Sequence, residues 1–163
     1  MKTDAQDRTF NIDRTFNAPR KLVFAAFSEC KHLKHWWSPE GWSLTVCEMD
    51  FREGGSWFYC MSGSGPDDKP MDSCGRADYQ EITAPERIVY TDSFVDKEGN
   101  PLEDMPSMQI TLRFEDVNGK TRITNKAIFG SKEELESVIE MGMKEGLKQT
   151  WDKLEAYLKS LTS

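Results

Sequence analysis

The sequence lacks the features that mark several large classes of protein. No apolar run approaches the roughly 20 residues that cross a bilayer, and residues 1–7 contain no apolar segment of the kind found in signal peptides. The formal net charge of −7, from 28 acidic and 21 basic side chains, provides no basic surface for nucleic acid or anionic lipid. We therefore expect a soluble, cytoplasmic protein with no nucleic-acid partner and no membrane span.

The short cysteine spacings of metal and redox motifs are also missing. The four cysteines are Cys30, Cys47, Cys60 and Cys74, and no two of them form a C-x-x-C pair, which is the signature of zinc ribbons and of thioredoxin-like sites. An even count permits two disulfides, but the cytoplasm is reducing. We therefore expect free thiols, with Cys47 and Cys60 behaving as small apolar side chains in strands.

Local motifs for catalysis or metal binding are scarce as well. His32 and His35 are the only histidines, and their spacing puts both on one face of a short helix. Because a zinc site needs three or four ligands, we interpret this pair as an exposed helix face. The chain has no G-x-S-x-G motif, and Gly63-Ser64-Gly65 is not followed by the lysine of a phosphate-binding loop. We expect no metal, no cofactor and no catalytic residue.

Alternating apolar residues are what the sequence has in quantity. With 37% hydrophobic and 11% aromatic residues, the chain can build one sizeable core, so we assign a single domain to residues 9–163 after a flexible segment, residues 1–8. Asn118-Gly119 is the strongest hairpin signal, because a type I′ turn needs two residues with positive φ. The pattern predicts strands at residues 8–16, 43–51, 56–61, 73–82, 87–95, 108–115 and 122–129.

Helical patterns lie before and after the main run of strands. Asn17-Ala18-Pro19 is typical of a helix start with an Asn cap, and a second short helix is expected from Ser28 to Trp36 or Trp37. The capping box Ser131-x-x-Glu134 opens one long C-terminal helix with an apolar stripe. Because one face of an antiparallel sheet must be covered, we expect this helix to cover it and to enclose a cavity.

Several segments together resemble one protein family. They are Ala18–Phe27, His32–Pro39, Asp50–Phe58, Gly75–Ile88 and the Gly146–Leu158 helix. These segments resemble the Activator of Hsp90 ATPase homologue 1-like family of the SRPBCC superfamily, also called START-like or Bet v 1-like. Glu53 departs from the pattern, since the family often has Pro before its Gly pair.

The resemblance implies an α+β helix-grip fold. Its expected form is a curved antiparallel sheet wrapped around a long C-terminal helix, in the order β-α-α-β6-α, with a deep apolar cavity under that helix. Members bind lipids, sterols, polyketides or other apolar molecules, and some are cyclases or dehydratases. The co-chaperone that names the family carries a further N-terminal domain to which nothing here corresponds, so the resemblance does not imply Hsp90 binding.

Two groups of candidate cavity residues leave alternatives open. Trp36 and Trp37 either seal one end of the core or form part of the cavity mouth, since aromatic residues dominate both environments. Asp92 shares its strand parity with Tyr90, so it either faces inward among aromatic rings or, as the uncertainty of strand ends favours, lies in solvent.

The paired glycines near the start of the last helix suggest close approach or empty space. Each of Gly142 and Gly146 costs about 1 kcal/mol relative to Ala inside a helix. We expect the turn they occupy to border the cavity, and Trp151 to face the sheet in a buried position. The full set of candidate cavity residues is Trp36, Trp37, Tyr59, Tyr79, Tyr90, Asp92, Met108, Met141, Gly142, Gly146 and Trp151.

The leading hypothesis is that the protein binds a small hydrophobic molecule between the sheet and the last helix, without catalysing a reaction. Two alternatives come from other classes: a co-chaperone-like protein-interaction module, and a cyclase or dehydratase acting in the cavity. The expected partner is an apolar ligand, and the sequence leaves open a homodimer.

Overall fold

A computed structural model describes residues 5–39, 41–65, 67–103 and 105–162. Over these residues, seven antiparallel strands form one sheet in the order β1-β7-β6-β5-β4-β3-β2. The elements are η1 (Ala5–Arg8), β1 (Thr9–Phe16), α1 (Arg20–Ser28), α2 (Cys30–Leu33), β2 (Ser43–Met49), β3 (Ser56–Ser64), β4 (Pro70–Thr83), β5 (Arg87–Val95), β6 (Ser107–Val117), β7 (Lys120–Phe129), α3 (Lys132–Glu140) and α4 (Met143–Thr162).

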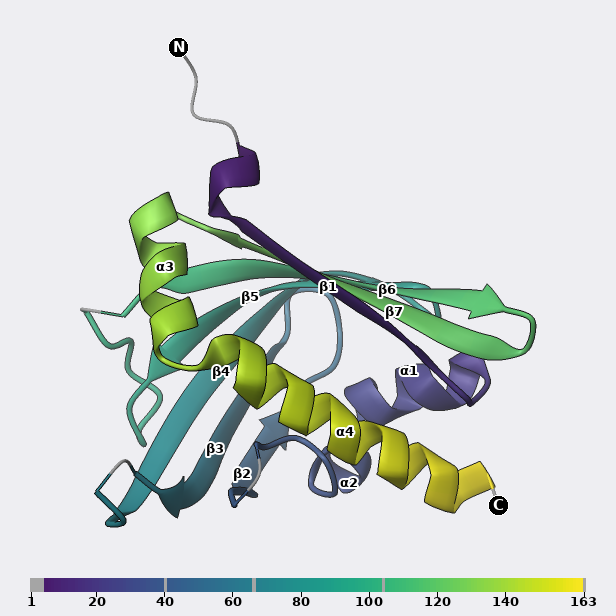
Figure 1. Ribbon diagram of the computed structural model, residues 1–163, viewed down its shortest axis with the longest axis horizontal. Coiled ribbons are helices and arrows are strands. Elements are labelled where there is room, and N and C mark those ends of the chain that lie inside the picture. The colour runs from purple at the N-terminus through teal and green to yellow at the C-terminus, as the bar shows by residue number, and fades with distance from the viewer. Residues whose placement is uncertain (1–4, 40, 66, 104, 163) are drawn as a thin grey trace.

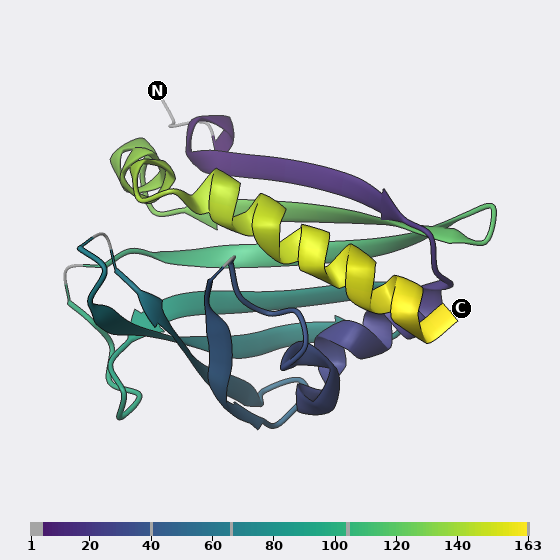
Figure 2. The same ribbon diagram turned by 60° about the horizontal axis from the view of Figure 1, so that its bottom comes forward.

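The sheet curves around the C-terminal helix, as the resemblance implied. Helix α4 runs diagonally across one face of the sheet, with α3 near one end of it and α1 and α2 near the other (Figure 1, Figure 2). The inward-facing residues of every strand except β2 contribute to one buried cluster, which also includes Phe27, Trp151 and Leu154. The α+β helix-grip fold is therefore confirmed.

Turn chemistry fixes the strand register at the clearest hairpin. Asn118 and Gly119 both have positive φ, at 55° and 85°, and Val117 pairs with Lys120 across the turn. This is the two-residue geometry that the Asn-Gly pair predicts. The β6–β7 register then places Ile110 opposite Ala127 on the inner face.

The helix ends differ in part from the sequence prediction. The capping box is present, because the Ser131 hydroxyl accepts a hydrogen bond from the Glu134 backbone N–H at 3.1 Å. The expected Asn cap is absent at α1, where Pro19 is the N-cap residue without a side-chain hydrogen bond. The second short helix is also shorter than predicted and ends at Leu33.

The C-terminal helix is broken, so the prediction of one continuous helix is wrong. Gly142 has a φ of 97°, which L-residues with side chains rarely adopt, and its N–H donates to the Ile139 carbonyl at 3.0 Å. This glycine ends α3 and lets α4 leave in a new direction. It does not reside in a helix interior, as the sequence analysis assumed.

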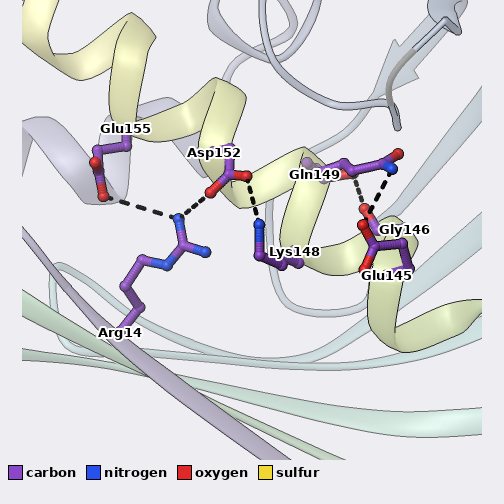
Figure 3. Close-up of polar contacts among 8 residues, drawn as sticks. Arg14, Glu145, Gly146, Lys148, Gln149, Asp152 and Glu155 are labelled. Carbon is purple, nitrogen blue, oxygen red and sulfur yellow. Dashed lines mark hydrogen bonds and ion pairs between the residues drawn. The ribbon is translucent and has the colours of Figure 1, made fainter.

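One aromatic contact and one polar cluster join helix α4 to strand β1. Trp151 is buried, as expected, and packs edge-to-face on Phe16 of β1 with ring centroids 5.7 Å apart. Arg14, also on β1, reaches Asp152 at 3.0 Å and Glu155 at 3.8 Å, while Lys148 binds the other oxygen of Asp152 (Figure 3). These contacts fix the helix relative to the edge strand.

All four cysteines are bonded, so the prediction of free thiols is wrong. Cys30–Cys47 joins α2 to β2, and Cys60–Cys74 joins register partners on β3 and β4. The cysteine spacing excludes metal motifs but does not show that strand pairing brings Cys60 and Cys74 together. A reducing cytoplasm would keep these thiols free, so the expected location favoured the wrong alternative.

Two further expectations concern the chain's start and its membrane contacts. Residues 1–4 of the segment expected to be flexible lie outside the described residues, whereas Arg8 of η1 donates to the Phe129 carbonyl. No helix in the described ranges combines the length and apolar character that a bilayer span requires.

Candidate functional site

The main candidate site is a pocket between the sheet and the α3–α4 junction. Its volume is about 310 Å³, at the lower end of the range for small-molecule sites. Its walls come from β1, β3, β5, β6 and β7, from the segment after α2, and from both C-terminal helices. The lining residues are Phe10, Trp37, Ser38, Pro39, Tyr59, Met61, Tyr90, Asp92, Phe94, Met108, Ile110, Asn125, Ala127, Val138, Met141, Gly142, Met143, Gly146, Leu147 and Thr150.

The structure brings most of the candidate cavity residues to this pocket. Lining it are Trp37, Tyr59, Tyr90, Asp92, Met108, Met141, Gly142 and Gly146. Three candidates lie in the core behind the lining: Trp36, Tyr79 and Trp151. The α3–α4 turn therefore borders the pocket, although Gly142 does so as a helix terminator.

The two neighbouring tryptophans have different places, so each alternative holds for one of them. Trp36 is buried in the core, and its indole N–H donates to the Ala26 carbonyl at 3.1 Å. Trp37 lines the pocket and packs edge-to-face on Trp57 and Tyr59, at 5.0 Å and 5.8 Å. Trp36 fixes the segment, which lets Trp37 form the wall.

Asp92 lies on the pocket wall, so the interpretation that it is solvated is wrong. The Tyr59 hydroxyl donates to its carboxylate, with the two oxygens at 3.0 Å and 3.3 Å. Burial raises the pKa of Asp92 to about 7, and the hydrogen bonds from Tyr59 and from the Ser93 backbone oppose this rise. The carboxyl group therefore changes charge near neutral pH.

A missing side chain on β4 makes this contact possible. Tyr59 is on β3 and Asp92 is on β5, so the phenol must cross the strand between them. Gly75 of β4 pairs with Tyr59, and a Cβ atom there would lie 2.3 Å from the Tyr59 oxygen. Only glycine leaves room for this crossing, which explains the first residue of the Gly75–Ile88 motif.

The tyrosines around Asp92 keep their protons. Burial, and after it the Asp92 charge, raises the pKa of Tyr59, Tyr79 and Tyr90 above the ordinary value for tyrosine. Tyr79 packs against Phe51 and Tyr90, and its buried hydroxyl has no hydrogen-bond partner in the described part of the chain. These groups can donate hydrogen bonds but cannot act as bases at neutral pH.

Asn125 is a lining residue that the sequence analysis missed. Its side-chain Oδ1 is buried, and no hydrogen-bond donor in the described ranges reaches it. A signal was available, because Asn125 shares the parity of the apolar residues Ile123, Ala127 and Phe129 on its strand. A lone amide on an inward strand face is a candidate ligand contact, since buried polar groups ordinarily find partners.

The segment after α2 is fastened to α4 at the pocket wall. The Lys153 ammonium donates to the Ser38 hydroxyl and to the Pro39 carbonyl, each at 3.0 Å, and to the Trp42 carbonyl at 3.2 Å. These three acceptors hold Trp37, Ser38 and Pro39 next to the first turns of α4. The wall is built by packing and hydrogen bonding, and the described residues of this segment that line the pocket carry no charge.

The two histidines lie away from the pocket. His32 Nδ1 is 2.6 Å from the Tyr157 hydroxyl, and the His35 ring stacks on the Tyr157 ring at 4.9 Å. Within the described ranges, no three His, Cys, Asp or Glu side chains are grouped as metal ligands would be. Both rings therefore contact Tyr157 of α4. His32 is half-buried there, whereas His35, beyond the end of α2, is exposed, so the expected exposed face is wrong for His32 only.

Comparison with known proteins agrees with this architecture. The family model described as Activator of Hsp90 ATPase homolog 1-like protein matches residues 17–159. No curated protein matches the chain.

Solved bacterial structures share the fold over nearly the whole chain. A Mycobacterium smegmatis protein is 28% identical with a TM-score of 0.84, covering 95% of this chain and 93% of its own. An Arthrobacter aurescens protein is 30% identical with a TM-score of 0.86, covering 98% and 90%. A Staphylococcus epidermidis protein is 33% identical with a TM-score of 0.80, covering 96% and 92%. The chain belongs to the Activator of Hsp90 ATPase homolog 1-like family, within the helix-grip SRPBCC superfamily.

Proposed function

We propose that the protein binds a small apolar molecule in the pocket between the sheet and the α3–α4 junction. The observation that carries this proposal is the lining itself, in which aromatic, aliphatic and Met side chains surround a few polar groups. Pockets of this composition are typical of small-molecule sites. Met61, Met108, Met141 and Met143 add adaptable walls, because the unbranched thioether fits ligands of different shape.

We favour ligand binding without catalysis over a cyclase or dehydratase activity in this pocket. Asp92 titrates near neutral pH and could act as an acid or base, but its nearest partner Tyr59 is a protonated donor. A nucleophile activated by a neighbouring base is not found among the described lining residues. The pocket therefore supplies an apolar surface and two polar groups, Asp92 and Asn125, that can bind a ligand.

The location of the protein in the cell can be tested separately from its binding of an apolar ligand. The cytoplasmic location expected from the sequence stays a prediction, and its support is weaker because both cysteine pairs are bonded. Disulfides persist mainly in oxidising compartments. The thiol state of protein taken directly from cells would test the location without affecting the binding proposal.

Fluorescence of N-phenyl-1-naphthylamine, a neutral apolar probe, tests the binding proposal. We expect saturable binding to the purified protein, and a Gly146→Leu variant that binds at least about tenfold more weakly. Gly146 lines the pocket, and a Cβ atom there would meet only Pro39, at an ordinary 3.8 Å. The added side chain therefore fills the pocket without a backbone collision.

A variant on the same helix turn provides the control. Glu145 is exposed and does not line the pocket, so Glu145→Leu should bind the probe as the wild type does. Circular dichroism should show both variants folded. Equal probe binding by folded Gly146→Leu and by wild type would rule out this pocket as the site, and an interaction module would become the leading hypothesis.

A further inference from the structure

The lining of the pocket carries acceptors and negative charge but no cation. Among the described lining residues, Asp92 is the only acid, and no Lys, Arg or His is present. Two lysines lie nearby, and each has a partner. Lys153 donates to three oxygen atoms of the segment after α2, and the Lys144 ammonium lies 5.9 Å from the centroid of the Phe10 ring.

Aromatic rings surround the Asp92 carboxylate. Tyr90 and Phe94 precede and follow it by two residues on β5, so all three side chains share the inner face of the strand. Tyr59 contacts the carboxylate from β3, and Trp37 packs on Tyr59. A carboxylate among aromatic rings is the combination that holds an ammonium group, because ring faces attract cations and the carboxylate pairs with them.

Two hydrogen-bond acceptors of the pocket have unfilled capacity. Tyr59 supplies a single proton to Asp92, so the carboxylate has lone pairs left for a ligand. Asn125 Oδ1 is a buried acceptor with no partner in the described part of the chain. A ligand that donates hydrogen bonds can satisfy both acceptors.

We propose that the pocket selects apolar amines, which place their ammonium group against Asp92 and its aromatic neighbours, and that it rejects apolar carboxylates of the same shape. This inference rests on the proposed function and names the ligand class. A carboxylate ligand would meet Asp92 without any cation to compensate. The net charge of −7 on the chain also favours the approach of a cation over that of an anion.

The titration of Asp92 agrees with this selection. The titratable groups facing it are Tyr59 from β3, Tyr79 from β4 and Tyr90 from its own strand, and all of them stay neutral near pH 7. Burial raises the pKa of Asp92 to about 7, so an ammonium ligand would lower that pKa by favouring the charged form. Amine binding should therefore strengthen as the pH rises from 6 to 8.

Three ligands of matched shape test the proposal: 1-naphthylmethylamine, 1-naphthylmethanol and 1-naphthoate. Each is titrated at pH 8 against the protein loaded with N-phenyl-1-naphthylamine, and displacement gives its affinity. We expect the amine to bind at least about tenfold more tightly than the carboxylate, with the alcohol between them. In Asp92→Asn, the amine should lose about tenfold while the alcohol changes by no more than about twofold.

The Asn variant keeps an acceptor for the Tyr59 hydroxyl, so it should fold. Asp68→Asn is the control for loss of one charge, because Asp68 is exposed, lies outside the pocket lining, and has a positive φ that Asn tolerates. It should leave all three affinities unchanged.

The two proposals fail in different ways. A carboxylate that binds as tightly as the amine, or an amine affinity that is unchanged in Asp92→Asn, would overturn the amine proposal while probe binding upholds the proposed function. Failure of the protein to bind N-phenyl-1-naphthylamine at all would overturn both.

Discussion

Asp92 makes the stability of the protein depend on pH in an unusual direction for a carboxyl group. Its pKa is raised from 3.8 to about 7 in the folded chain, so between these values the folded state holds a proton that the unfolded state has lost. Stability from this group is present at low pH and is lost as the pH rises through about 7. The shift corresponds to at most about 4 kcal/mol.

We therefore expect Asp92→Asn to be more stable than the wild type at pH 8, and we expect this advantage to shrink as the pH falls from 7 towards 4. Asn cannot ionise, so the variant lacks the cost of burying a charge. Urea denaturation at several pH values measures both proteins. A wild-type advantage that grows between pH 5 and pH 8 would contradict the raised pKa.

Gly75 is the second residue whose role can be isolated. We expect Gly75→Ala to lower the free energy of unfolding by about 1–3 kcal/mol, because the new Cβ collides with the Tyr59 phenol. The variant should also bind the probe less tightly, since Tyr59 must move away from Asp92.

Gly65 provides the control in the same hairpin. A Cβ atom there would meet the sulfur of Met71 at 3.2 Å, the far part of a flexible side chain, and would lie at ordinary contact distances of 3.6 Å and 3.7 Å from Asp67 Oδ1 and the Lys69 carbonyl. Gly65→Ala should therefore be close to neutral. Equal denaturation midpoints for the two variants would show that Tyr59 does not cross β4 at Gly75.

At the scale of elements, the broken C-terminal helix gives its two glycines opposite roles. Gly142→Ala should cost about 1–2 kcal/mol, because its φ of 97° strains any residue with a Cβ atom. Gly146→Ala should gain about 0.5–1 kcal/mol, because Gly146 is helical and its Cβ would meet only Pro39. Thermal denaturation of both variants checks the signs, and a gain for both would mean one continuous helix.

The contact between α4 and β1 gives a larger effect. Trp151 is buried against Phe16, so Trp151→Ala should cost about 3–5 kcal/mol through the cavity it leaves. Tyr157→Ala, on the partly exposed part of the same helix, should cost less. An unchanged midpoint for Trp151→Ala in chemical denaturation would contradict this packing.

Elements with a strong local signal could be predicted from the sequence, and long-range pairings could not. Alternation and the Asn118-Gly119 turn predicted the strands because their geometry depends on neighbouring residues. The break at Gly142 was missed because a glycine in an apolar periodic segment looks the same in a helix interior as at a helix end. The place of Gly75 under Tyr59 depends on the register of β3 and β4, which no local pattern gives.

The candidate site was predictable to the same extent. Tyr90 and Met108 were among the expected cavity residues and line the pocket, and the glycines pointed to the turn that borders it. Asp92 required a choice between two interpretations, and uncertainty about the strand end favoured the wrong one. Asn125 was not predicted because it is a single polar residue on an apolar strand face and belongs to no cluster of reactive residues in the sequence.

At the scale of the whole molecule, two disulfides close loops at one side of the sheet. Their sequence separations are 17 and 14 residues, and loops of this length stabilise a fold by about 3 kcal/mol each. Titration of the denatured protein without reductant should therefore find no free thiol. Four free thiols would restore the original expectation of reduced cysteines.

Loss of the Cys60–Cys74 disulfide should separate stability from ligand binding. These cysteines neighbour Tyr59 and Gly75, yet β3 pairs with β4 along its whole length, and Cys60 and Cys74 pack with Val95 in a small cluster apart from the main core. A Cys60→Ser/Cys74→Ser double variant should thus lose about 3 kcal/mol while its probe affinity changes by less than about twofold. Denaturation and probe titration of one sample measure both quantities. A large loss of affinity in the folded variant would mean that the disulfide, and not the strand pairing, holds Tyr59 over Gly75.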